Sequence, residues 1–482
     1  MFPRVLYFLL LARVAQAAAP FSIQGPGVNP SDFRITVFAT NVYYPLGMVQ
    51  LSDASLLVAT SQGNSFWSST GQIVRFTDTN QDGIADGAGT ILCTGLPGGL
   101  TSLRMWGNLI FVTGQGPGKP ISILRSGATP GGALTLVGQI NINYPSGSWE
   151  HPHSALQVRP TPGQPGSCDL LFQFGSDANS TKTMRTGSLS SSQIPGASGT
   201  LEGESIYMLT LTDYTTNVVA SNLTRLAKGL RNPAGFAFHP VTGDLYFEDN
   251  GIDGLINADE PLSADELNWI AAAQIGNGPV PDFGFPTNYT VYRTGVLAGG
   301  GGVQPLVAFQ PQPNPATGSE SEGPNDIAFA PRGFPNGLNN GIFVGFHGRF
   351  GLGGIANEEN PLVFVDLRNT NYFQFIGNNE PNIGHLDGLL STDDSLFIAD
   401  LAATGDISTA GRAGVIYQIK SAVSRLLLYN VSNDDLQLVW KVGVLQRADS
   451  PSGPWSDVPD ASSPFVVAID ANLPNVFYRT KY

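Results

Sequence analysis

One pattern recurs along the chain and limits its fold more than any other feature. A turn leads into an apolar segment, a polar turn follows, and a second, more apolar segment comes next, as in PLGMVQLSDASLLVAT and PAGFAFHPVTGDLYFED. Most copies are followed by a third segment of strand type, such as GQIVRFTD or AGVIYQIK. About six copies occur, and they begin at Pro45, Leu100, Ser154, Pro233, Asn325 and Asp387.

These copies predict an all-β fold built from small antiparallel sheets. A sheet of this size cannot bury both of its faces alone, and stacking the copies around a common axis covers them. We therefore expect a six-bladed β-propeller over residues 30–420, with the long loops gathered on one face. A pair of β-sandwiches is the alternative architecture.

The composition favours strands and argues against two classes of partner. Only 13% of the 482 residues are charged, and 58 glycines and 35 prolines supply turns. The formal net charge of −14 disfavours nucleic acid and anionic membranes, because both are negatively charged. A small neutral substrate is compatible with this charge.

The two ends of the chain differ in sequence pattern from the repeated part. Residues 1–17 resemble a secretory signal, with Arg4 in a basic start, an apolar stretch over residues 5–11, and Ala15-Gln16-Ala17 as a cleavage site. A buried first strand is the alternative. No later segment has the ~20 apolar residues of a membrane helix, so we expect a secreted or periplasmic protein. Residues 421–482 have strands and turns of their own and predict a small β-sandwich-like accessory domain.

Export would allow two covalent modifications. Cys93 and Cys168 permit at most one disulfide, and nothing in the sequence shows that they are close. In a eukaryotic secretory pathway, exposed N-x-S/T motifs would carry glycans. These motifs stand at Asn179, Asn222, Asn288 and Asn430.

A cation and an amide precede the strand of GLRNPAGFAFHPVTGDLYFEDNG. In a propeller, the residues before an innermost strand line the mouth of the central channel, so Arg231 and Asn232 are candidate site residues. A guanidinium there binds carboxylate or carbonyl oxygens in a fixed geometry. The alternative is a structural arginine that forms a salt bridge between blades.

Two histidines hold the same place in the preceding copy, SWEHPHSALQV. A histidine at the channel mouth suits a general base, because its ordinary pKa lies near neutrality. Matching Leu156 to Phe236 brings His153 into register with Pro233, close to the level of Arg231, so His153 is preferred over His151. The alternative for both is a solvated loop position.

Two acidic segments could hold calcium. The segment from Glu248, EDNGIDGLINADEPLSADELNWI, is rich in oxygen ligands, and Gly251 allows backbone carbonyls to turn inward. The loop DTNQDGIADG matches the first part of an EF-hand-like loop but has Gly89 at the twelfth position. Solvated acidic turns are the alternative in both places. The candidate ligands of the second loop are Asp78, Asn80, Asp82 and Asp86.

The stretch GLRNPAGFAFHPVTGDLYFEDNG, followed by DELNWI, resembles the glucose/sorbosone dehydrogenase family. Weaker support comes from NNGIFVGFHGRFG and GVIYQI, and the resemblance covers roughly residues 33–420. Members of this family are exported six-bladed propellers that use pyrroloquinoline quinone (PQQ) with Ca²⁺. The resemblance implies an exported sugar or aldose dehydrogenase that passes a hydride from a sugar carbon to PQQ.

The resemblance also implies roles for individual residues. His153 would take the proton from the anomeric hydroxyl of the sugar, and Arg231 would stabilise the developing charge. The other implied positions are Asn232, Asn250, His347 and Arg349 for the cofactor, and the carbonyls of Gly251 and Ile252 for Ca²⁺.

The chain departs from the family pattern in NIGHLDGLL, where the family usually places arginine against the carboxylates of the cofactor. His385 and Leu386 stand there instead, and an unpaired tricarboxylate would be costly to bury. Two other functions therefore stay open. One is a non-catalytic propeller that binds carbohydrate or protein, and the other is a Ca²⁺-dependent propeller lactonase using Glu248, Asp249 and Asp387.

Overall fold

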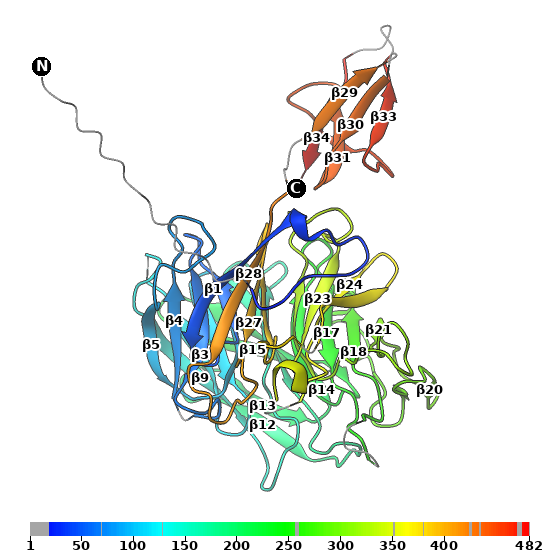
Figure 1. Cartoon of the computed structure of the whole chain (residues 1–482). Helices are drawn as coiled ribbons and strands as arrows, with labels where there is room; N and C mark the ends of the chain where they lie inside the picture. Colours follow the sequence, from blue (N-terminus) through cyan, green and yellow to red (C-terminus); the bar gives the residue numbers. More distant parts are fainter. Residues whose placement is uncertain are drawn as a thin grey trace, which may run out of the picture.

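The computed structural model describes residues 19–68, 70–127, 129–255, 260–349, 352–378, 380–423, 427–432, 435–469 and 475–481. Most regular elements in it are β-strands (Figure 1). The helical elements are short 3-10 turns, η1 (Pro30–Asp32), η2 (Ala272–Gln274) and η3 (Gly354–Ala356). Within these described ranges, no helix is long and apolar enough to cross a membrane. The predicted signal, residues 1–17, lies outside them.

Six antiparallel sheets form the body of the described chain. The first contains β2 (Met48–Gln50), β3 (Leu56–Gln62), β4 (Thr70–Phe76) and β5 (Thr90–Leu96). The second contains β6 (Leu100–Trp106), β7 (Leu109–Gly114), β8 (Ile121–Arg125) and β9 (Thr135–Asn143), extended by β12 (Thr186–Ser190) and β13 (Ser198–Glu202). The third contains β10 (Leu156–Pro160), β11 (Ser167–Phe174), β14 (Ser205–Asp213) and β15 (Val218–Lys228).

The other three sheets have the same strand order. The fourth contains β16 (Pro233–Phe238), β17 (Leu245–Asp249), β18 (Glu266–Ile270) and β21 (Val307–Ala308). The fifth contains β22 (Pro324–Phe329), β23 (Gly341–Phe346), β24 (Leu362–Asp366) and β25 (Tyr372–Ile376). The sixth contains β26 (Gly388–Ser391), β27 (Ser395–Asp400), β28 (Gly414–Ser421) and β1 (Phe33–Val42). A separate hairpin pairs β19 (Tyr289–Thr290) with β20 (Leu297–Ala298).

The first strands of the six sheets contact one another in a closed ring. β2 contacts β6, β6 contacts β10, β10 contacts β16, β16 contacts β22, β22 contacts β26, and β26 contacts β2. β1, from the start of the described chain, pairs with β28 near the end of the ring, with Phe33 opposite Ser421. The ends of the repeated part are therefore joined within one sheet. The predicted all-β fold is confirmed.

In four of the six sheets the second strand is buried along its whole length. Every residue of β7, β11, β23 and β27 is buried. These strands are the second, more apolar segments of the repeated pattern. A strand covered on both faces loses the alternation of apolar and polar residues, which explains the continuous apolar runs.

Gly384 precedes β26 and packs closely against the backbone of Ala402. A Cβ atom added there would lie 1.6 Å from the carbonyl oxygen of Ala402. We expect Gly384→Ala to lower the free energy of unfolding by about 2–3 kcal/mol, because overpacking forces the backbone to shift. Gly87→Ala is the control, since nothing lies within 4 Å of a Cβ there. Urea denaturation checks this, and equal midpoints for the two variants would contradict it.

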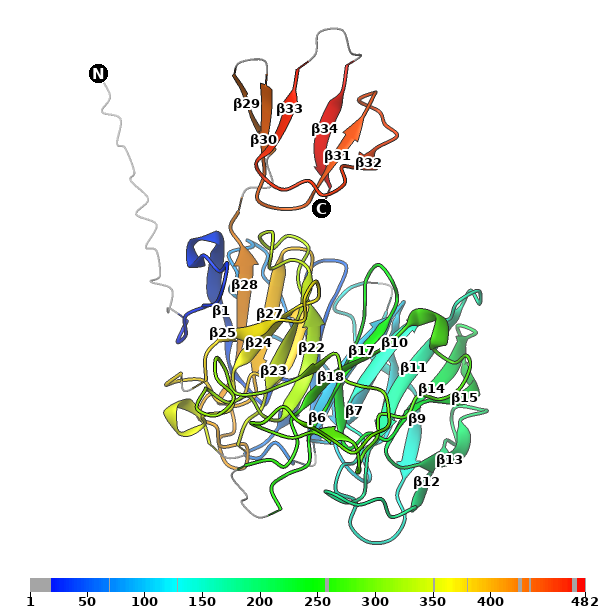
Figure 2. The ribbon, with the colours of Figure 1, turned by 90° about the vertical axis from the view of Figure 1, so that its right-hand side faces the viewer.

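The C-terminal strands form two further sheets, which stand apart from the body in both views (Figures 1 and 2). They enclose a small apolar cluster that includes Leu438, Trp440 and Leu445. Lys441 connects them to the body, through an ion pair with Asp32 (Nζ–Oδ1 3.1 Å) and a carbonyl that accepts an N–H from the loop before β23. One sheet contains β29 (Leu428–Ser432), β30 (Asp435–Val439) and β33 (Phe465–Ala468), and the other β31 (Val444–Ala448), β32 (Ser456–Asp457) and β34 (Phe477–Lys481).

The two cysteines are both free thiols. Cys93 lies half-buried on β5, and Cys168 lies buried on β11 in another sheet. Burial raises the pKa of both thiols. The disulfide that the sequence left open is therefore not formed.

The four glycosylation motifs have different surroundings. Asn222 and Asn430 are exposed. The side-chain oxygens of Asn179 and Asn288 accept hydrogen bonds within the fold. A glycan attaches to the side-chain nitrogen, and Asn179 and Asn288 are half-buried, so the exposed Asn222 and Asn430 would be the better acceptors.

Candidate functional site

A polar cavity of about 410 Å³ opens where the chain enters several of the first strands. Its wall comes from loop residues just before β10, β16, β22 and β26, from the loop between β17 and β18, and from the loop after β23. One guanidinium there faces six carboxylates and two imidazoles. These residues are Arg231, then Glu150, Asp253, Asp265, Glu322, Glu359 and Asp387, then His151 and His347.

The acidic end of β17 holds the start of β16 in place. The two strands are antiparallel, with Pro233 opposite Asp249. The Asp249 carboxylate accepts the backbone N–H of Arg231 (3.0 Å) and of Asn232 (2.6 Å). Burial raises the pKa of Asp249 to about 7, while these bonds and the nearby guanidinium oppose the shift. The acid thus positions the two residues that precede the strand.

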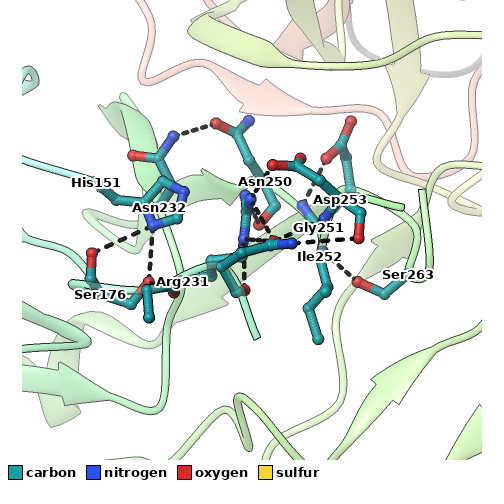
Figure 3. Close-up of polar contacts among 12 residues, drawn as sticks. His151, Ser176, Arg231, Asn232, Asn250, Gly251, Ile252, Asp253 and Ser263 are labelled. Atoms are coloured by element: carbon teal, nitrogen blue, oxygen red, sulfur yellow. Dashed lines mark hydrogen bonds and ion pairs between the residues drawn. The ribbon is translucent and has the colours of Figure 1, made fainter. Parts of the chain in front are cut away.

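The Arg231 side chain is buried but lines the cavity. Figure 3 shows its guanidinium beside Asp253. Its Nη2 donates to Asp253 Oδ2 (2.6 Å) and to Asn179 Oδ1 (2.9 Å), and its Nε donates to the Asn179 carbonyl (3.0 Å). These bonds fix the plane of the guanidinium. The positive charge is therefore held at one point of the wall before any ligand enters.

His151 lies in the same wall, and its partners identify its tautomer. The Ser176 hydroxyl, which donates to the Ala178 carbonyl (2.8 Å), lies 2.7 Å from His151 Nδ1. Since the Ser176 carbonyl near Nδ1 can only accept, Nδ1 carries the hydrogen and Nε2 keeps its lone pair. Burial, and then Arg231, lowers the pKa of His151 to about 3. His151 is thus neutral, with Nε2 able to accept a hydrogen bond, and its low pKa makes it a weaker base than an ordinary histidine.

His153 occupies a different environment from the one that the register predicted. It is fully buried and does not line the cavity. Its Nε2 lies 2.7 Å from the Lys119 carbonyl, to which it must donate, and its Nδ1 lies 2.7 Å from the Tyr144 hydroxyl. Burial lowers its pKa to about 4. With both ring nitrogens engaged, the predicted place of His153 at the channel mouth is wrong, and His151 stands there.

Asn232 and Asn250 both line the cavity, as the family resemblance implies. The Asn232 amide donates to Asn250 Oδ1 (2.5 Å), and the Asn250 amide donates to the Pro324 carbonyl (2.8 Å). The two side chains therefore form a chain of amides from β16 across to β22. This chain presents polar atoms to a ligand in the cavity.

The backbone after β17 contains Gly251 and Ile252, whose carbonyls are the implied calcium ligands. Gly251 donates its N–H to Asp265 Oδ1 (2.7 Å). The Ile252 carbonyl accepts the N–H groups of Leu262 (2.7 Å) and Ser263 (3.3 Å). The Ile252 carbonyl thus already accepts two N–H groups, and its role as a calcium ligand stays a prediction.

The Asp78 loop is folded around its own backbone. Asp78 accepts the N–H groups of Asp82 (3.1 Å) and Gly83 (2.8 Å), and Asp86 accepts that of Thr79 (3.0 Å). Asn80 donates its amide to Asp82 (2.9 Å). Among the described residues, the acids grouped closely enough to share a metal ion lie elsewhere.

The segment after β23 contributes His347 to the cavity. Asp387 accepts the hydrogen of His347 Nδ1 (2.8 Å), and the His347 ring stacks on that of His385 at 4.0 Å. Arg349 does not line the cavity, and its Nε donates to Glu359 (2.9 Å). Of the two residues predicted to bind the cofactor here, His347 therefore lines the cavity and Arg349 does not.

The acidic wall is the feature that the sequence analysis missed. Burial raises the pKa of Asp265 to about 7, and burial with Glu359 and Asp265 nearby raises that of Glu322 to about 9. Asp265 also accepts N–H groups from Gly251 and Gly323, which joins β16–β18 to β22. The run SESEGPN before β22 was the available signal in the sequence.

Such raised pKa values predict a pH dependence of stability. Burial, with Asp249 and Asp265 nearby, raises the pKa of Glu266 to about 8 from 4.5. The folded state therefore binds a proton more tightly than the unfolded state, and the contribution is lost as the pH rises from about 4.5 to 8. We expect Glu266→Gln to be more stable than the wild type at pH 8 by at least about 1.4 kcal/mol, the value of one pKa unit.

Thermal denaturation across pH 5–8 measures this effect. Asn268 donates to Glu266 (3.2 Å), and glutamine can accept the same bond. Glu358→Gln is the control, because Glu358 is exposed. A Glu266→Gln curve that stays parallel to the wild-type curve would contradict the prediction.

The residues of the wall do not fit a tricarboxylate such as PQQ. Arg231 is its one guanidinium and is already bonded to Asp253, while Arg349 is committed to Glu359. Six carboxylates line the same space, and burying an unpaired anion among them is costly. The donor set is instead suited to neutral hydroxyl groups and to cations.

Comparisons with known proteins identify the fold. No family model matches the chain. A 61-residue stretch, 13% of the chain, is 41% identical to an uncharacterized protein of Borreliella burgdorferi and spans only 14% of that protein. The holo PQQ domain of pyranose dehydrogenase from Coprinopsis cinerea aligns with a TM-score of 0.51 and 14% identity, over 84% of this chain and 99% of that one.

Two further solved structures agree. The calcium structure of Trichoderma reesei family AA12 aligns with a TM-score of 0.52 and 16% identity, over 85% of this chain and all of that one. A glucose dehydrogenase aligns with a TM-score of 0.50 and 12% identity, over 81% and 100%. The resemblance is confirmed at the level of the fold: the chain has the fold of the PQQ-dependent sugar dehydrogenases.

Proposed function

We propose that the chain is a carbohydrate-active protein that binds a neutral sugar in the cavity and takes a proton from a sugar hydroxyl at Nε2 of His151. The observation that carries this proposal is that a neutral His151 and the fixed guanidinium of Arg231 line one polar cavity. The imidazole accepts the proton, and the cation stabilises the alkoxide that forms. The anomeric hydroxyl is the expected donor, because it is the most acidic hydroxyl of a sugar.

The charge of the wall supports a neutral ligand. Carboxylates repel anions but accept hydrogen bonds from hydroxyl groups, and the amides of Asn232 and Asn250 add donors and acceptors. Among the solved structures with this fold, two are called pyranose dehydrogenase and glucose dehydrogenase, which also points to sugars.

The finer architecture and the location are parts of the same proposal. The six sheets around the ring of first strands would be the blades of a six-bladed propeller over residues 30–420. The sheets of residues 421–482 would be an accessory domain. Residues 1–17 would direct export.

A second candidate is the quinoprotein dehydrogenase, with PQQ and Ca²⁺ as cofactors. The presence of His151 and Arg231 in one cavity of this fold favours the dehydrogenase, and the acidic wall argues against it. The lactonase alternative has less support. Of its three carboxylates, Asp387 alone lines the cavity, whereas Glu248 is fully buried and Asp249 holds backbone N–H groups.

Calorimetry and polarimetry test the proposal without a redox cofactor. The purified chain is titrated with glucose, galactose, xylose and a disaccharide. Loss of the anomeric proton opens the sugar ring and the ring oxygen takes up a proton, so acceleration of mutarotation reports proton abstraction. We expect saturable binding of at least one sugar, together with faster mutarotation.

Each outcome separates the candidates. Absence of sugar binding at tens of millimolar would overturn the proposal. Repeating the titration with PQQ, Ca²⁺ and an electron-accepting dye tests the second candidate. Dye reduction that requires PQQ would establish the dehydrogenase. It would also contradict our interpretation of the acidic wall. Binding without mutarotation would reduce the function to carbohydrate recognition.

A further inference from the structure

A group of acids in the cavity wall has no role in the proton transfer. One carboxylate oxygen from each of Glu320, Glu322 and Glu359 lies within 4.8 Å of the others. Glu320 and Glu322 precede β22, and Glu359 precedes β24. The two segments are joined by the backbone, because Glu322 donates its N–H to the Glu359 carbonyl (3.1 Å). Glu322 and Glu359 face the cavity, so the group forms part of its wall.

The guanidiniums nearby do not balance these acids. Arg293 pairs with Glu320 and with Glu260 (Nε–Oε2 2.6 Å), and Arg349 pairs with Glu359 (2.9 Å). Two guanidiniums therefore pair with three of the four carboxyl groups, and no ion pair within the described residues involves Glu322. Glu322 Oε1 is also buried without a hydrogen-bond partner.

A buried tyrosine supplies an independent observation. Tyr292 is 5% exposed, and its buried hydroxyl lies against the Glu322 carboxyl without forming a hydrogen bond of good geometry. Burial raises the pKa of this hydroxyl, and the charge and side-chain contact of Glu322, followed by the charge of Asp265, raise it further. An unsatisfied buried hydroxyl costs about 1–3 kcal/mol. Such a group calls for a partner such as a bound ion.

We propose that Glu320, Glu322, Glu359 and Tyr292 bind a hard divalent cation, with Ca²⁺ as the best match, in the wall of the cavity. Ca²⁺ takes oxygen ligands at about 2.3–2.6 Å, so oxygens up to about 4.8 Å apart can share one ion. The ion would relieve the repulsion among the acids and give the tyrosine oxygen a partner. This position differs from the Gly251–Ile252 carbonyls and from the Asp78 loop.

The ion would also act on the ligand. Because Glu322 and Glu359 line the cavity, a bound ion would be open to it on one side, where Ca²⁺ can accept hydroxyl oxygens as ligands. It would also tie the loop before β22 to the loop before β24. Ca²⁺ binding is itself independent of the proton transfer at His151.

The test is calorimetric titration of the chelator-treated, full-length chain with CaCl₂ alone. Glu322→Gln keeps the shape of the side chain but cannot lose a proton to become an anionic ligand, and Tyr292→Phe removes only the hydroxyl. Asp82→Asn is the matched control, because it alters the other acidic loop. We expect Glu322→Gln to weaken binding at least tenfold, Tyr292→Phe to weaken it severalfold, and Asp82→Asn to leave this site unchanged.

Thermal denaturation with and without 5 mM CaCl₂ provides a second readout, since an ion that binds only the folded state raises the midpoint. We expect the rise to be smaller in Glu322→Gln than in the wild type. Absence of Ca²⁺ binding up to 10 mM would overturn the proposal. So would binding that Asp82→Asn abolishes and Glu322→Gln leaves intact. Circular dichroism at 20 °C confirms that each variant is folded.

Discussion

His151→Ala is expected to abolish the acceleration of mutarotation while leaving the fold intact. The substitution removes the nitrogen that would accept the proton. A positioned base contributes about 10²–10⁴-fold to a rate, and the low pKa of His151 places its contribution at the lower end of that range. The Ser176 hydroxyl keeps its bond to the Ala178 carbonyl, so the loop retains a polar anchor. Polarimetry measures the rate, and thermal denaturation measures the stability.

The pH profile provides the internal check on this role. Because the pKa of His151 lies at about 3, the imidazole stays neutral from pH 5 upward. The wild-type rate should therefore not fall with protonation of this group between pH 8 and pH 5. A His151→Ala variant with the full wild-type rate would exclude His151 as the proton acceptor.

His153→Ala is expected to have the opposite effect, a loss of about 4 kcal/mol in the free energy of unfolding. The change removes a fully buried ring, leaves a cavity, and takes from the Tyr144 O–H its acceptor and from the Lys119 carbonyl its shorter donor. The Tyr144 oxygen still accepts the backbone N–H of residue 153. Removing a large buried side chain costs about 3–5 kcal/mol, and each unsatisfied polar group adds to that cost. Urea denaturation gives the value directly.

Two controls separate packing from chemistry at His153. His153→Gln can restore part of the hydrogen bonding and should recover part of the stability. Variants that remain folded at low temperature should still bind sugar with an affinity close to that of the wild type, because His153 does not line the cavity. A stable His153→Ala protein without proton abstraction would return the catalytic role to His153.

Much of the fold follows from local patterns. The repeated pairs of apolar segments become the first and second strands of the sheets, and the more apolar member becomes the buried one, as in β11 and β23. The placement of Arg231 and Asn232 also follows locally, because both precede a strand and β17 runs antiparallel to it. Asp249 then holds their backbone from the partner strand.

The choice between the two histidines could not be made in this way. β10 begins at Leu156, so His151 and His153 lie in the preceding loop, where counting along a strand does not apply. His153 is captured by Tyr144 and by the Lys119 carbonyl, whereas Ser176 from beyond β11 orients His151. Each of these contacts joins separate segments of the chain.

The sequence alone accounts for the strands, their turns and the cation that precedes β16, because these depend on neighbouring residues and on simple periodicity. The acidic wall exists only in the folded chain, since Glu322 and Glu359 come from different loops and meet through backbone pairing. The Ile252 carbonyl likewise finds its hydrogen-bond donors only in the folded chain, because they are the N–H groups of Leu262 and Ser263. Burial and hydrogen-bond partners set the charge and reactivity of a group, and both are properties of contacts between distant segments.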